Sequence, residues 1–509
     1  MKLADIIDSI HIKSVSGSLD LEIDEICFDS RKARKGSVFC ALPGVNADGN
    51  EFVEAALEAG ADAIISEQPY PATSTATWLH VGNAREAMGI ASANLYGNPS
   101  MEMATIGVTG TNGKTTTSLL IHHLLQCNMR RAGMIGTIEY VIGDHSRPAP
   151  HTTPESPELQ HLLREMRDED CRGVVMEVSS HGLTQHRTTG VHFDVGVFTN
   201  LSQDHLDFHG NMDAYFEAKK LLMDRMDEDP RKKGVMIINK DDSYGDRLLK
   251  APGISRIERI SFGRSANCDF KASDIKSGFD GTQFKLSMKG RQCLVKTPLI
   301  GGFNVYNTLA ALAAVKGIKL NMREAIKNLE TCPQVPGRLE AVGGRQINYR
   351  VFVDYAHTPD ALVNAVATLR ELKPNRLITV FGCGGDRDRS KRAPMAAAAE
   401  AGSDFSILTS DNPRTEDPES ILADAERGFR GSAYEKIPDR REAIRRAIDL
   451  AGARDIVLIA GKGHETYQEI DGVRHDFDDR LEARNAIAAK AEKPIEDEFP
   501  ESDYDRDRY

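Results

Sequence analysis

The chain has 509 residues, more than a single hydrophobic core normally organises, so we expect several domains. Its net charge of −12, with 28% charged and 40% hydrophobic residues, is that of an ordinary globular protein and gives no case for a nucleic-acid partner. No apolar run reaches the roughly 18 residues of a membrane span, and the acidic start does not fit a signal peptide. We expect a cytoplasmic protein without a nucleic-acid or membrane partner.

Residues 1–100 are predicted to form a first α/β domain. Apolar runs at 23–28, 36–42 and 63–65 predict strands, and the spacing at 52–59 predicts a helix. The first of these runs ends in Asp29-Ser30-Arg31, which taken alone is a polar turn.

A glycine-rich turn opens the second predicted domain, residues 101–334. It reads Gly110-Thr111-Asn112-Gly113-Lys114-Thr115-Thr116 and lies between a predicted strand at 104–108 and a predicted helix. Such a turn lets backbone N–H groups surround phosphate oxygens at the start of a helix. Lys114 would reach the β- and γ-phosphates, and Thr115 would bind Mg²⁺. Val108 stands where the common phosphate loop has its first glycine, so we expect a nucleotide site with a variant loop.

Polar residues follow two further predicted strands of this domain, at 173–176 and 195–198. Glu177 comes directly after the first strand, and His205 lies in the polar segment after the second. Because ligands gather at the carboxyl ends of parallel strands, we expect both side chains to meet the metal ion of the nucleotide.

Two other features of this domain are weak on their own. Lys219 lies in a predicted helix at 215–222, where a lysine is normally a solvated residue. Asn304 and Asn307 precede a predicted helix at 308–315 and offer amide groups suited to an adenine edge.

A third domain is predicted over residues 335–493. Four apolar runs, at 350–353, 377–381, 405–408 and 456–460, alternate with helical segments, and each leads to Gly, Asp or Arg. This pattern predicts a second open α/β sheet with its polar loops at one edge.

Charge and cysteine content describe the remainder of the chain. Residues 494–509 hold seven Asp or Glu and two Arg, which predicts a disordered acidic tail. The eight cysteines form no CxxC pair, which argues against a zinc site and predicts reduced thiols.

Together, these motifs resemble the Mur ligase family, the ATP-dependent amide-forming enzymes of peptidoglycan precursor synthesis. Residues 110–116 match that family's phosphate loop. Residues 177–183 with Gln185 and Arg187, and the segment 204–207, are typical of the branch that adds the third residue of the stem peptide. The resemblance covers nearly the whole chain before the tail. It implies an α/β protein of three domains: an N-terminal UDP-binding domain, a central P-loop ATPase-like domain with a parallel sheet, and a C-terminal Rossmann-like domain.

The resemblance also assigns site residues. It implies that the UDP-muramoyl-dipeptide is held by Ser30, Thr152, Thr153, Ser179, Gln185 and Arg187. It implies that ATP is held by residues 110–116 together with Asn304 (base), Arg338 (phosphate) and Asp354 (ribose). In the family, the lysine at the position of Lys219 is carbamylated by CO₂, which gives a carboxylate that suits Mg²⁺. The expected catalytic set is Lys114, Glu177, His205 and Lys219, and the expected metal ligands are Thr115, Glu177, His205 and carbamylated Lys219.

The amino-acid substrate is expected to be meso-diaminopimelate. The motif Asp411-Asn412-Pro413-Arg414 resembles the version in family members that use this substrate, whereas lysine-adding relatives lack the arginine. A guanidinium can bind the second carboxylate of diaminopimelate through two parallel hydrogen bonds. Arg387 would help to hold the substrate, and Glu465 with the Gly461 backbone would hold an ammonium group.

In the expected reaction, ATP phosphorylates the D-glutamate side-chain carboxylate of the dipeptide, and the amine of the amino acid attacks the acyl phosphate. Several alternatives stay open: an L-lysine-adding homologue, a folylpolyglutamate synthase, a D-alanyl-D-alanine-adding relative and a non-catalytic interaction module. A folylpolyglutamate synthase would not need residues 179–187, and a D-alanyl-D-alanine-adding relative would lack the motif at 411–414. A non-catalytic module should have lost Lys114 or Lys219. We expect a monomer.

Overall fold

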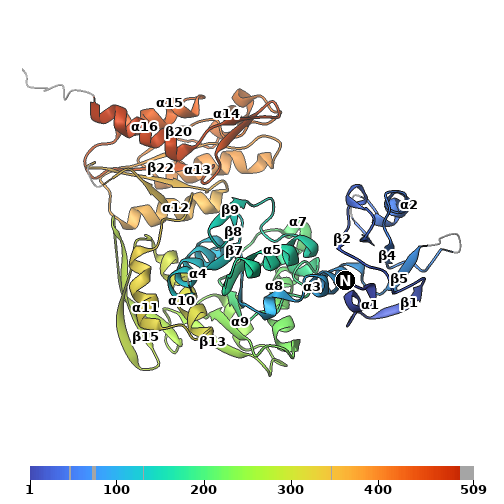
Figure 1. The fold of residues 1–509 in the computed structure, drawn as a ribbon. Helices are drawn as coiled ribbons and strands as arrows, with labels where there is room; N and C mark the ends of the chain where they lie inside the picture. The colour runs from blue at the N-terminus through green and yellow to red at the C-terminus, as the bar shows by residue number, and fades with distance from the viewer. Residues whose placement is uncertain (45–46, 72–75, 130, 345–346, 493–509) are drawn as a thin grey trace, which may run out of the picture. The chain divides into compact units, whose positions relative to one another are not determined.

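In the computed structural model, the described residues are 1–44, 47–71, 76–129, 131–344 and 347–492 (Figure 1). Spatial proximity divides the chain into two units, Met1–Pro333 and Gln334–Tyr509. The acidic segment 494–509 lies outside the described residues, and the expected domain limits at 100, 334 and 493 stay predictions.

The first unit begins with a five-stranded sheet in the order β1-β5-β4-β3-β2, in which only β1 runs antiparallel. Its strands are β1 Ile12–Ser16, β2 Glu25–Cys27, β3 Ser37–Ala41, β4 Ala63–Ser66 and β5 Thr77–Val81. Its helices are α1 Leu3–Ile6, α2 Val53–Glu58 and α3 Ala84–Leu95, with short 3₁₀ helices η1 Ser30–Lys32 and η2 Gly49–Phe52. Val38 and Cys40 join one hydrophobic cluster and Phe39 and Ala41 another, so both faces of β3 are covered, as in a buried parallel strand.

An eleven-stranded sheet follows, in the order β16-β15-β14-β13-β12-β11-β6-β10-β7-β8-β9. The strands from β14 to β7 in this order are parallel, and the outer strands are antiparallel to their neighbours. The strands are β6 Ala104–Thr109, β7 Ala132–Ile135, β8 Glu139–Ile142, β9 His145–Pro148, β10 Gly173–Glu177, β11 Val195–Phe198, β12 Val235–Asn239, β13 Glu258–Gly263, β14 Phe270–Gly278, β15 Gly281–Met288 and β16 Arg291–Thr297. The helices are η3 Pro99–Met101, α4 Lys114–Met129, α5 Ser156–Asp168, α6 Ser180–Thr184, α7 Leu206–His209, α8 Met212–Glu228, α9 Ser243–Leu249, α10 Gly302–Gly317, α11 Met322–Asn328 and η4 Leu329–Thr331.

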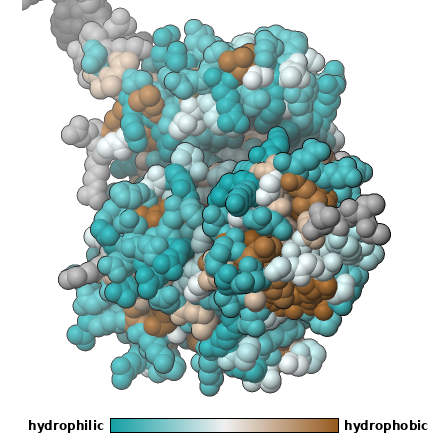
Figure 2. Space-filling view, turned by 45° about the vertical axis from the view of Figure 1, so that its right-hand side comes forward, coloured by the Kyte–Doolittle hydropathy of each residue, from teal (hydrophilic) through white to brown (hydrophobic). Residues whose placement is uncertain are grey.

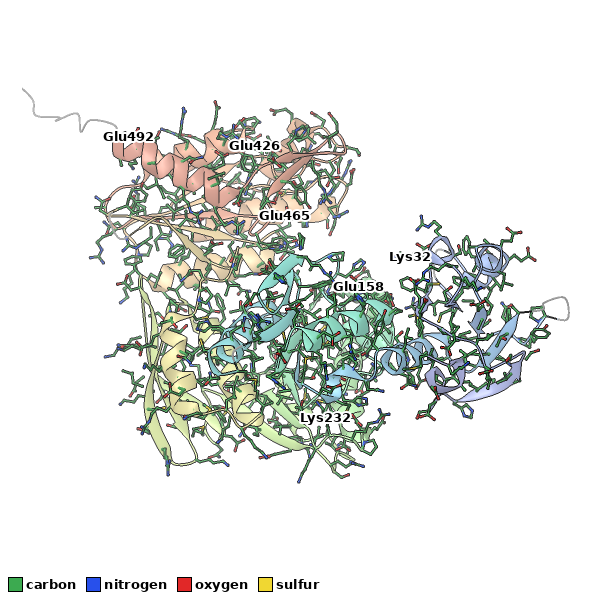
Figure 3. The ribbon with its side chains drawn as sticks, in the orientation of Figure 1. Lys32, Glu158, Lys232, Glu426, Glu465 and Glu492 are labelled. Atoms are coloured by element: carbon green, nitrogen blue, oxygen red, sulfur yellow. The ribbon has the colours of Figure 1, made fainter. Side chains whose placement is uncertain are left out.

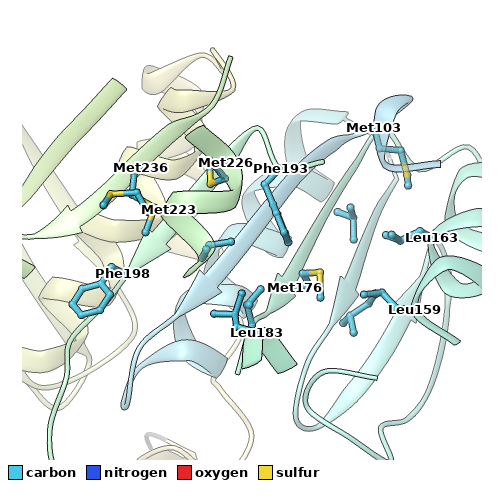
Figure 4. Packing of buried hydrophobic residues seen from close by; sticks show 14 of the residues in the cluster. Met103, Leu159, Leu163, Met176, Leu183, Phe193, Phe198, Met223, Met226 and Met236 are labelled. Atoms are coloured by element: carbon cyan, nitrogen blue, oxygen red, sulfur yellow. The ribbon is translucent and has the colours of Figure 1, made fainter. Parts of the chain in front are cut away.

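Apolar residues of α5 and α8 pack on this sheet (Figure 4). Leu159 and Leu163 of α5 belong to the same buried cluster as Met176 of β10, together with Met223 and Met226 of α8. Their burial removes apolar area from water, which contributes a stabilising free energy of about 25 cal/mol per Å². It fixes α5 and α8 to the sheet.

The centre of the sheet determines which loops meet. β6 lies between β10 and β11, with Val108 opposite Glu177 and Thr109 opposite Phe198. Because these three strands are parallel and in register at their carboxyl ends, the segments that follow them leave the sheet at the same edge.

The second unit contains a six-stranded sheet in the order β17-β18-β22-β19-β20-β21, parallel except for β17. Its strands are β17 Glu340–Val342, β18 Arg350–Asp354, β19 Leu377–Phe381, β20 Phe405–Leu408, β21 Tyr434–Lys436 and β22 Ile456–Ala460, and β23 Tyr467–Ile470 and β24 Val473–Asp476 form a separate hairpin. Its helices are α12 Pro359–Glu371, η5 Arg389–Lys391, α13 Arg392–Gly402, α14 Pro418–Glu426, α15 Arg440–Leu450 and α16 Asp479–Glu492. The α/β class is therefore confirmed in both units.

Two local predictions were wrong. The helix α10 begins at Gly302, not at residue 308, so Asn304 and Asn307 lie inside the helix rather than in a preceding loop. The pair Gly301-Gly302 suggested a loop, but only Gly301 has a positive φ, 94°, and the helix starts directly after it. Glu177 is the last residue of β10 and not the first residue after it.

No helix among the described residues is long and apolar enough to cross a bilayer. The face in Figure 2 is mostly hydrophilic, with hydrophobic side chains in separate small groups.

Candidate active site

The glycine-rich turn connects β6 to α4, as predicted. Lys114 is the first residue of α4, and its Nζ donates to the carbonyl oxygens of Gly110 at 3.1 Å and Thr111 at 2.9 Å. The ammonium thus folds over its own loop, where a phosphate oxygen could replace either acceptor. The helix N-terminus adds partial positive charge at the same place.

Two positions of the loop require glycine. Gly110 has a φ of +145°, and a Cβ there would lie 1.9 Å from Thr199 Oγ1. Gly113 has a φ of +81°, and its Cβ would lie 2.4 Å from Asn307 Oδ1. L-residues rarely adopt such backbone angles, so any side chain would both strain the loop and displace its neighbours.

Glu177 presents a buried carboxylate to this loop. It is 1% exposed, and its Oε2 accepts hydrogen bonds from Thr115 Oγ1 at 3.2 Å and Thr137 Oγ1 at 3.1 Å. Its Oε1 accepts from the Thr137 backbone N–H at 2.9 Å. A carboxylate beside a threonine hydroxyl is an arrangement of oxygen ligands that suits Mg²⁺.

Lys219 projects from α8 and is 1% exposed. Its Nζ donates to Gly110 O at 2.8 Å, the same carbonyl oxygen that accepts from Lys114, and lies 4.6 Å from the centre of the Tyr215 ring. Burial and the nearby Lys114 charge lower the pKa of Lys219 well below its ordinary value. No carboxylate among the described residues lies within ion-pair distance of this Nζ, so the site favours a neutral amine.

His205 is placed differently from Lys219. It is exposed, has a φ of 51° and directly precedes α7. Its ring centre lies 6.1 Å from that of Tyr215 and 5.1 Å from that of His181. Since Tyr215 also contacts Lys219, two of the predicted metal ligands lie around one tyrosine ring.

Within the described ranges, no group of three or more His, Cys, Asp or Glu side chains is arranged to hold a metal ion. The expected set draws only Glu177 and His205 from these types and needs the Thr115 hydroxyl and a modified Lys219 to complete it. The contact between Thr115 and Glu177 fits Mg²⁺, and the full set stays a prediction.

Five of the six residues predicted to hold the UDP-muramoyl-dipeptide form one network. Thr153 Oγ1 donates to Glu177 O at 2.9 Å and accepts from Ser179 N at 3.0 Å. Arg187 donates to Thr153 O at 2.9 Å and to Gln185 Oε1 at 2.8 Å.

Thr152 joins this network through the Thr137 hydroxyl at 3.1 Å, which also donates to Glu177. Ser30 lies apart, in η1, and its side chain contacts none of the other five among the described residues. Ser179 has a second role, because its Oγ accepts from Gly182 N as the N-cap of α6.

Asn304 is linked to the phosphate loop from inside α10. Its Nδ2 donates to Ile300 O at 2.8 Å, and its Oδ1 accepts from Asn307 Nδ2 at 2.9 Å. Asn307 Oδ1 in turn accepts from Thr117 Oγ1 of α4 at 3.3 Å. The adenine contact expected of Asn304 stays a prediction, and the amide chain connects this residue to the helix of the phosphate loop.

Arg338 and Asp354 lie in the second unit. Asp354 accepts from Leu339 N at 2.7 Å and Ala356 N at 2.9 Å, and burial raises the pKa of this carboxyl against the opposite effect of the Arg338 charge. The Arg338 guanidinium lies 5.1 Å from the centre of the Tyr355 ring.

The residues predicted to hold the amino acid gather in the second unit, in the loops after β19, β20 and β22. Asn412 is 3% exposed, and its Nδ2 donates to Glu465 Oε2 at 2.9 Å. Glu465 is labelled in Figure 3. Gly461 has a φ of +121°, and a Cβ there would lie 2.6 Å from Asp411 Oδ2, so the Asp411 carboxylate lies directly against this glycine.

Arg414 joins two of these loops. Its Nη1 donates to Gly385 O at 2.7 Å, and its backbone, with a φ of 53°, pairs with the β23 strand through Glu469 O at 3.0 Å. Its Nε lies 3.8 Å from Glu469 Oε2, and the Nη2 group makes no hydrogen bond among the described residues, so it can be offered to a carboxylate. Arg387 is exposed and donates only to Asp386 O, at 3.0 Å, among the described residues.

The same two loops are tied to each other at several further points. A Cβ on Gly385 would lie 1.9 Å from Pro413 O. Asp386 accepts from Thr415 N at 3.1 Å and from Thr415 Oγ1 at 2.9 Å. Glu416 accepts from Asp386 N at 2.6 Å and from the buried Arg392 at 2.8 Å.

Sequence reasoning missed two residues of the site. Thr137, between β7 and β8, holds both oxygens of Glu177, and Lys462, directly after Gly461, is fully buried beside Asn412 and Glu465. An isolated threonine in a loop carries no signal in the sequence. The run Gly461-Lys462-Gly463 follows an apolar strand, but nothing in the sequence distinguishes its lysine from an exposed loop residue.

Comparison with known proteins identifies relatives over nearly the whole chain. Three stretches match family descriptions: "Mur ligase family, catalytic domain" over 22–96, "Mur ligase middle domain" over 108–315, and "Mur ligase, glutamate ligase domain" over 337–463.

Individual relatives agree with these matches. The UDP-N-acetylmuramoyl-L-alanyl-D-glutamate--2,6-diaminopimelate ligase of Geobacter metallireducens is 43% identical and covers 97% of this chain and 99% of its own. The enzyme of that name from Geobacillus kaustophilus is 44% identical and covers 90% of this chain and 94% of its own. A solved structure of a ligase of the same name is similar at a TM-score of 0.74, with 37% identity, and covers 97% of this chain and 100% of that chain.

Proposed function

The chain belongs to the Mur ligase family, and we propose that it adds meso-2,6-diaminopimelate to the D-glutamate residue of UDP-N-acetylmuramoyl-L-alanyl-D-glutamate in peptidoglycan precursor synthesis. The observation that carries the proposal is the hydrogen bond between Asn412 and Glu465, 2.9 Å, with Arg414 two residues after Asn412 in the same loop. An amide, a guanidinium and a carboxylate together complement a carbon atom that bears both a carboxylate and an ammonium group. Diaminopimelate has such a carbon atom at its far end, whereas lysine has only an ammonium group there.

The reaction is ATP-dependent. The γ-phosphoryl group passes to the side-chain carboxylate of D-glutamate and leaves ADP. The amine of diaminopimelate then attacks the acyl phosphate, and the tetrahedral intermediate collapses to the amide with release of phosphate. Phosphoryl transfer needs positioning and charge neutralisation more than covalent help. Residues 110–116 are proposed to hold the phosphates, with Lys114 as the mobile cation, and Asn304, Arg338 and Asp354 to hold the base, a phosphate and the ribose.

We assign the metal site to Thr115, Glu177, His205 and Lys219, the last as a carbamate. Mg²⁺ bound there would neutralise phosphate charge. The neutral amine favoured at Lys219 can add to CO₂, forming a C–N bond and releasing one proton, and the resulting carbamate is an anion near the Lys114 ammonium. The residues that surround Lys219 therefore fit the modification.

The UDP-muramoyl-dipeptide is assigned to Ser30, Thr152, Thr153, Ser179, Gln185 and Arg187. The chain is proposed to act as a monomer in the cytoplasm, with no nucleic-acid or membrane partner. The L-lysine-adding homologue and the non-catalytic Mur-like module are the alternatives to be tested.

Phosphate release tests the proposal. Purified enzyme is incubated with ATP, Mg²⁺ and UDP-N-acetylmuramoyl-L-alanyl-D-glutamate, and either meso-diaminopimelate or L-lysine is added. We expect phosphate release with diaminopimelate at a kcat/KM at least about 100-fold above that with L-lysine. A preference for L-lysine would overturn the assigned substrate, and no release with any amino acid would favour the non-catalytic module.

A further inference from the structure

A fully buried lysine lies behind the residues assigned to the amino-acid substrate. Lys462 follows Gly461 and has a side-chain exposure of 0%. Its Nζ donates to Asn412 Oδ1 at 2.9 Å and to Glu465 Oε2 at 3.3 Å, and lies 3.9 Å from Asp411 Oδ1. The ring centre of Tyr467 lies 5.5 Å away. A buried ammonium with this many partners is a fixed part of the site.

Lys462 determines which way the Asn412 amide points. Asn412 Oδ1 accepts from Lys462 Nζ and from the Glu469 backbone N–H at 3.0 Å. Two donors on one side of the amide leave Nδ2 to face Glu465. Nδ2 has a second hydrogen, which finds no other acceptor among the described residues and can be offered to a substrate carboxylate.

Lys462 also gives the two oxygens of the Glu465 carboxylate different roles. Oε2 accepts from both Asn412 and Lys462, whereas Oε1 has no hydrogen-bond donor within the described part of the chain. The Glu465 side chain is 18% exposed, so its free oxygen can meet a substrate ammonium.

Lys462 offsets one of the two negative charges beside Asn412, and the neighbouring Arg414 is already paired with Glu469 at 3.8 Å. Asp411 and Glu465 are the acids that face the Lys462 ammonium. Arg440 and Asp479, behind them, form a matched pair at 2.7 Å with both side chains fully buried. Removal of the Lys462 charge would leave two carboxylates facing the subsite, and both would repel a substrate carboxylate.

We propose that Lys462 is a positioning residue that sets amino-acid specificity: its ammonium orients the Asn412 amide and offsets the Asp411 and Glu465 charges, so that the subsite accepts a substrate carbon bearing both a carboxylate and an ammonium group. The inference rests on the proposed function. L-lysine has only an ammonium group at that carbon, so it does not depend on the outward Nδ2 donor or on the reduced negative charge.

The test compares Lys462→Met, which removes the charge but keeps an unbranched chain, with Lys462→Arg, which keeps the charge. The measured quantity is the ratio of kcat/KM for meso-diaminopimelate to kcat/KM for L-lysine. We expect this ratio to fall at least about tenfold in Lys462→Met, through a higher KM for diaminopimelate, and to change less in Lys462→Arg. The KM values for ATP and the UDP-muramoyl-dipeptide should stay within roughly threefold of wild type.

Lys490→Met is the matched control. Lys490 Nζ also donates to backbone oxygens, those of Ile448 at 2.7 Å and Asp449 at 3.2 Å, and lies 4.8 Å from the Tyr349 ring, and none of these three residues is assigned to the substrate. The Lys490→Met variant should therefore leave the ratio of kcat/KM values unchanged. If Lys462→Met does not fold, Lys462→Gln serves instead, since it keeps a donor for Asn412 Oδ1 without the charge, and its ratio should also fall.

Two results would overturn the inference. One is an unchanged ratio in the folded Lys462 variants. The other is an equal loss of kcat for both amino acids, which is the mark of a purely structural residue. Calorimetric binding of both amino acids gives the same ratio if turnover is too slow. A wild-type preference for L-lysine would refute the proposed function instead, and the change from wild type to variant would still decide the role of Lys462.

Discussion

Two buried lysines, one in each unit, have opposite surroundings. Lys219 and Lys462 are both at most 1% exposed, and both lie near a tyrosine ring, at 4.6 Å and 5.5 Å from its centre. Lys219 shares a carbonyl oxygen with a second lysine and has no carboxylate within ion-pair distance among the described residues. Lys462 contacts Glu465 and an asparagine oxygen and lies 3.9 Å from Asp411.

The difference shows that burial alone does not determine what a lysine does. Around Lys219 the ammonium is disfavoured, so the residue is suited to chemical modification and to an anionic role. Around Lys462 the ammonium is held by acids, so the residue is suited to orienting its neighbours. Substitutions at and around each lysine separate these two roles.

The largest effect is expected from Lys219→Ala. Ligation should fall by about a thousandfold or more, because the proposed carbamate ligand is lost, and short carboxylates such as acetate should restore part of it. Phosphate release measures both. The control is Lys220→Ala, the neighbouring lysine, which pairs with Asp224 at 2.7 Å and should remain active. Full activity of Lys219→Ala would remove the distinction between the two lysines.

Lys114→Ala should be next in size. We expect at least about a hundredfold loss of rate, in line with roughly 3–4 kcal/mol for one charge stabiliser. It should also raise the pKa of Lys219, because Lys114 is one of the causes of its depression. Steady-state kinetics and ¹³C-labelled CO₂ uptake at Lys219 measure these effects, and unchanged turnover would mean that the loop does not bind the phosphates.

Arg414→Ala should weaken the use of meso-diaminopimelate by roughly 30-fold, because one partner of a charge pair is truncated at a cost of about 2 kcal/mol or more. Use of L-lysine should change much less. The measurement is kcat/KM for both amino acids, with Arg441→Ala as the control, since Arg441 contacts Glu482 and the Phe477 ring, neither of which is assigned to the substrate. An equal effect on both amino acids would contradict the assigned contact.

The smallest effect concerns stability. Lys219→Met should raise the free energy of unfolding at pH 7 by about 1 kcal/mol, whereas Lys462→Met should lower it. The pKa of Lys219 is depressed in the folded state, so the unfolded chain binds more protons between that pKa and the ordinary value of 10.5. Wild-type stability should therefore rise with pH in this window, and the advantage of Lys219→Met should shrink as pH approaches 10.5.

Urea unfolding in CO₂-free buffer at several pH values measures this prediction. A loss of stability in both variants would show that the two lysines are equally well accommodated in the unmodified protein.

Much of the fold was predictable because its signals are local. The strand, loop and helix around Lys114 follow from a short apolar run, a glycine turn and helical spacing, and the parallel core of the second unit follows from its apolar runs. The edge strands β17 and β21 have three residues each, too few to form a recognisable pattern. The start of α10 was misplaced because two glycines resemble a loop.

The site was predictable in its residue types and less so in its contacts. Motifs indicated Glu177 and Asn412, but not that Thr137 and Lys462 hold them, because those partners come from other loops and are selected by packing. The burial of Lys219 was also hidden, since a lysine in an amphipathic helix normally faces water. Local sequence predicts which groups are present, whereas tertiary structure determines which of them are already engaged.

The tight packing between the loops after β19 and β20 has a consequence for protein engineering and for the evolution of substrate preference. Gly385 leaves no room for a Cβ beside Pro413, and Asp386 and Thr415 are joined side chain to side chain. If only one loop were replaced by that of a relative with another substrate, it would therefore not fit the other loop. The two loops therefore have to be exchanged together. A new substrate preference is easier to obtain by replacing both loops at once, as in recombination, than by single substitutions made one at a time.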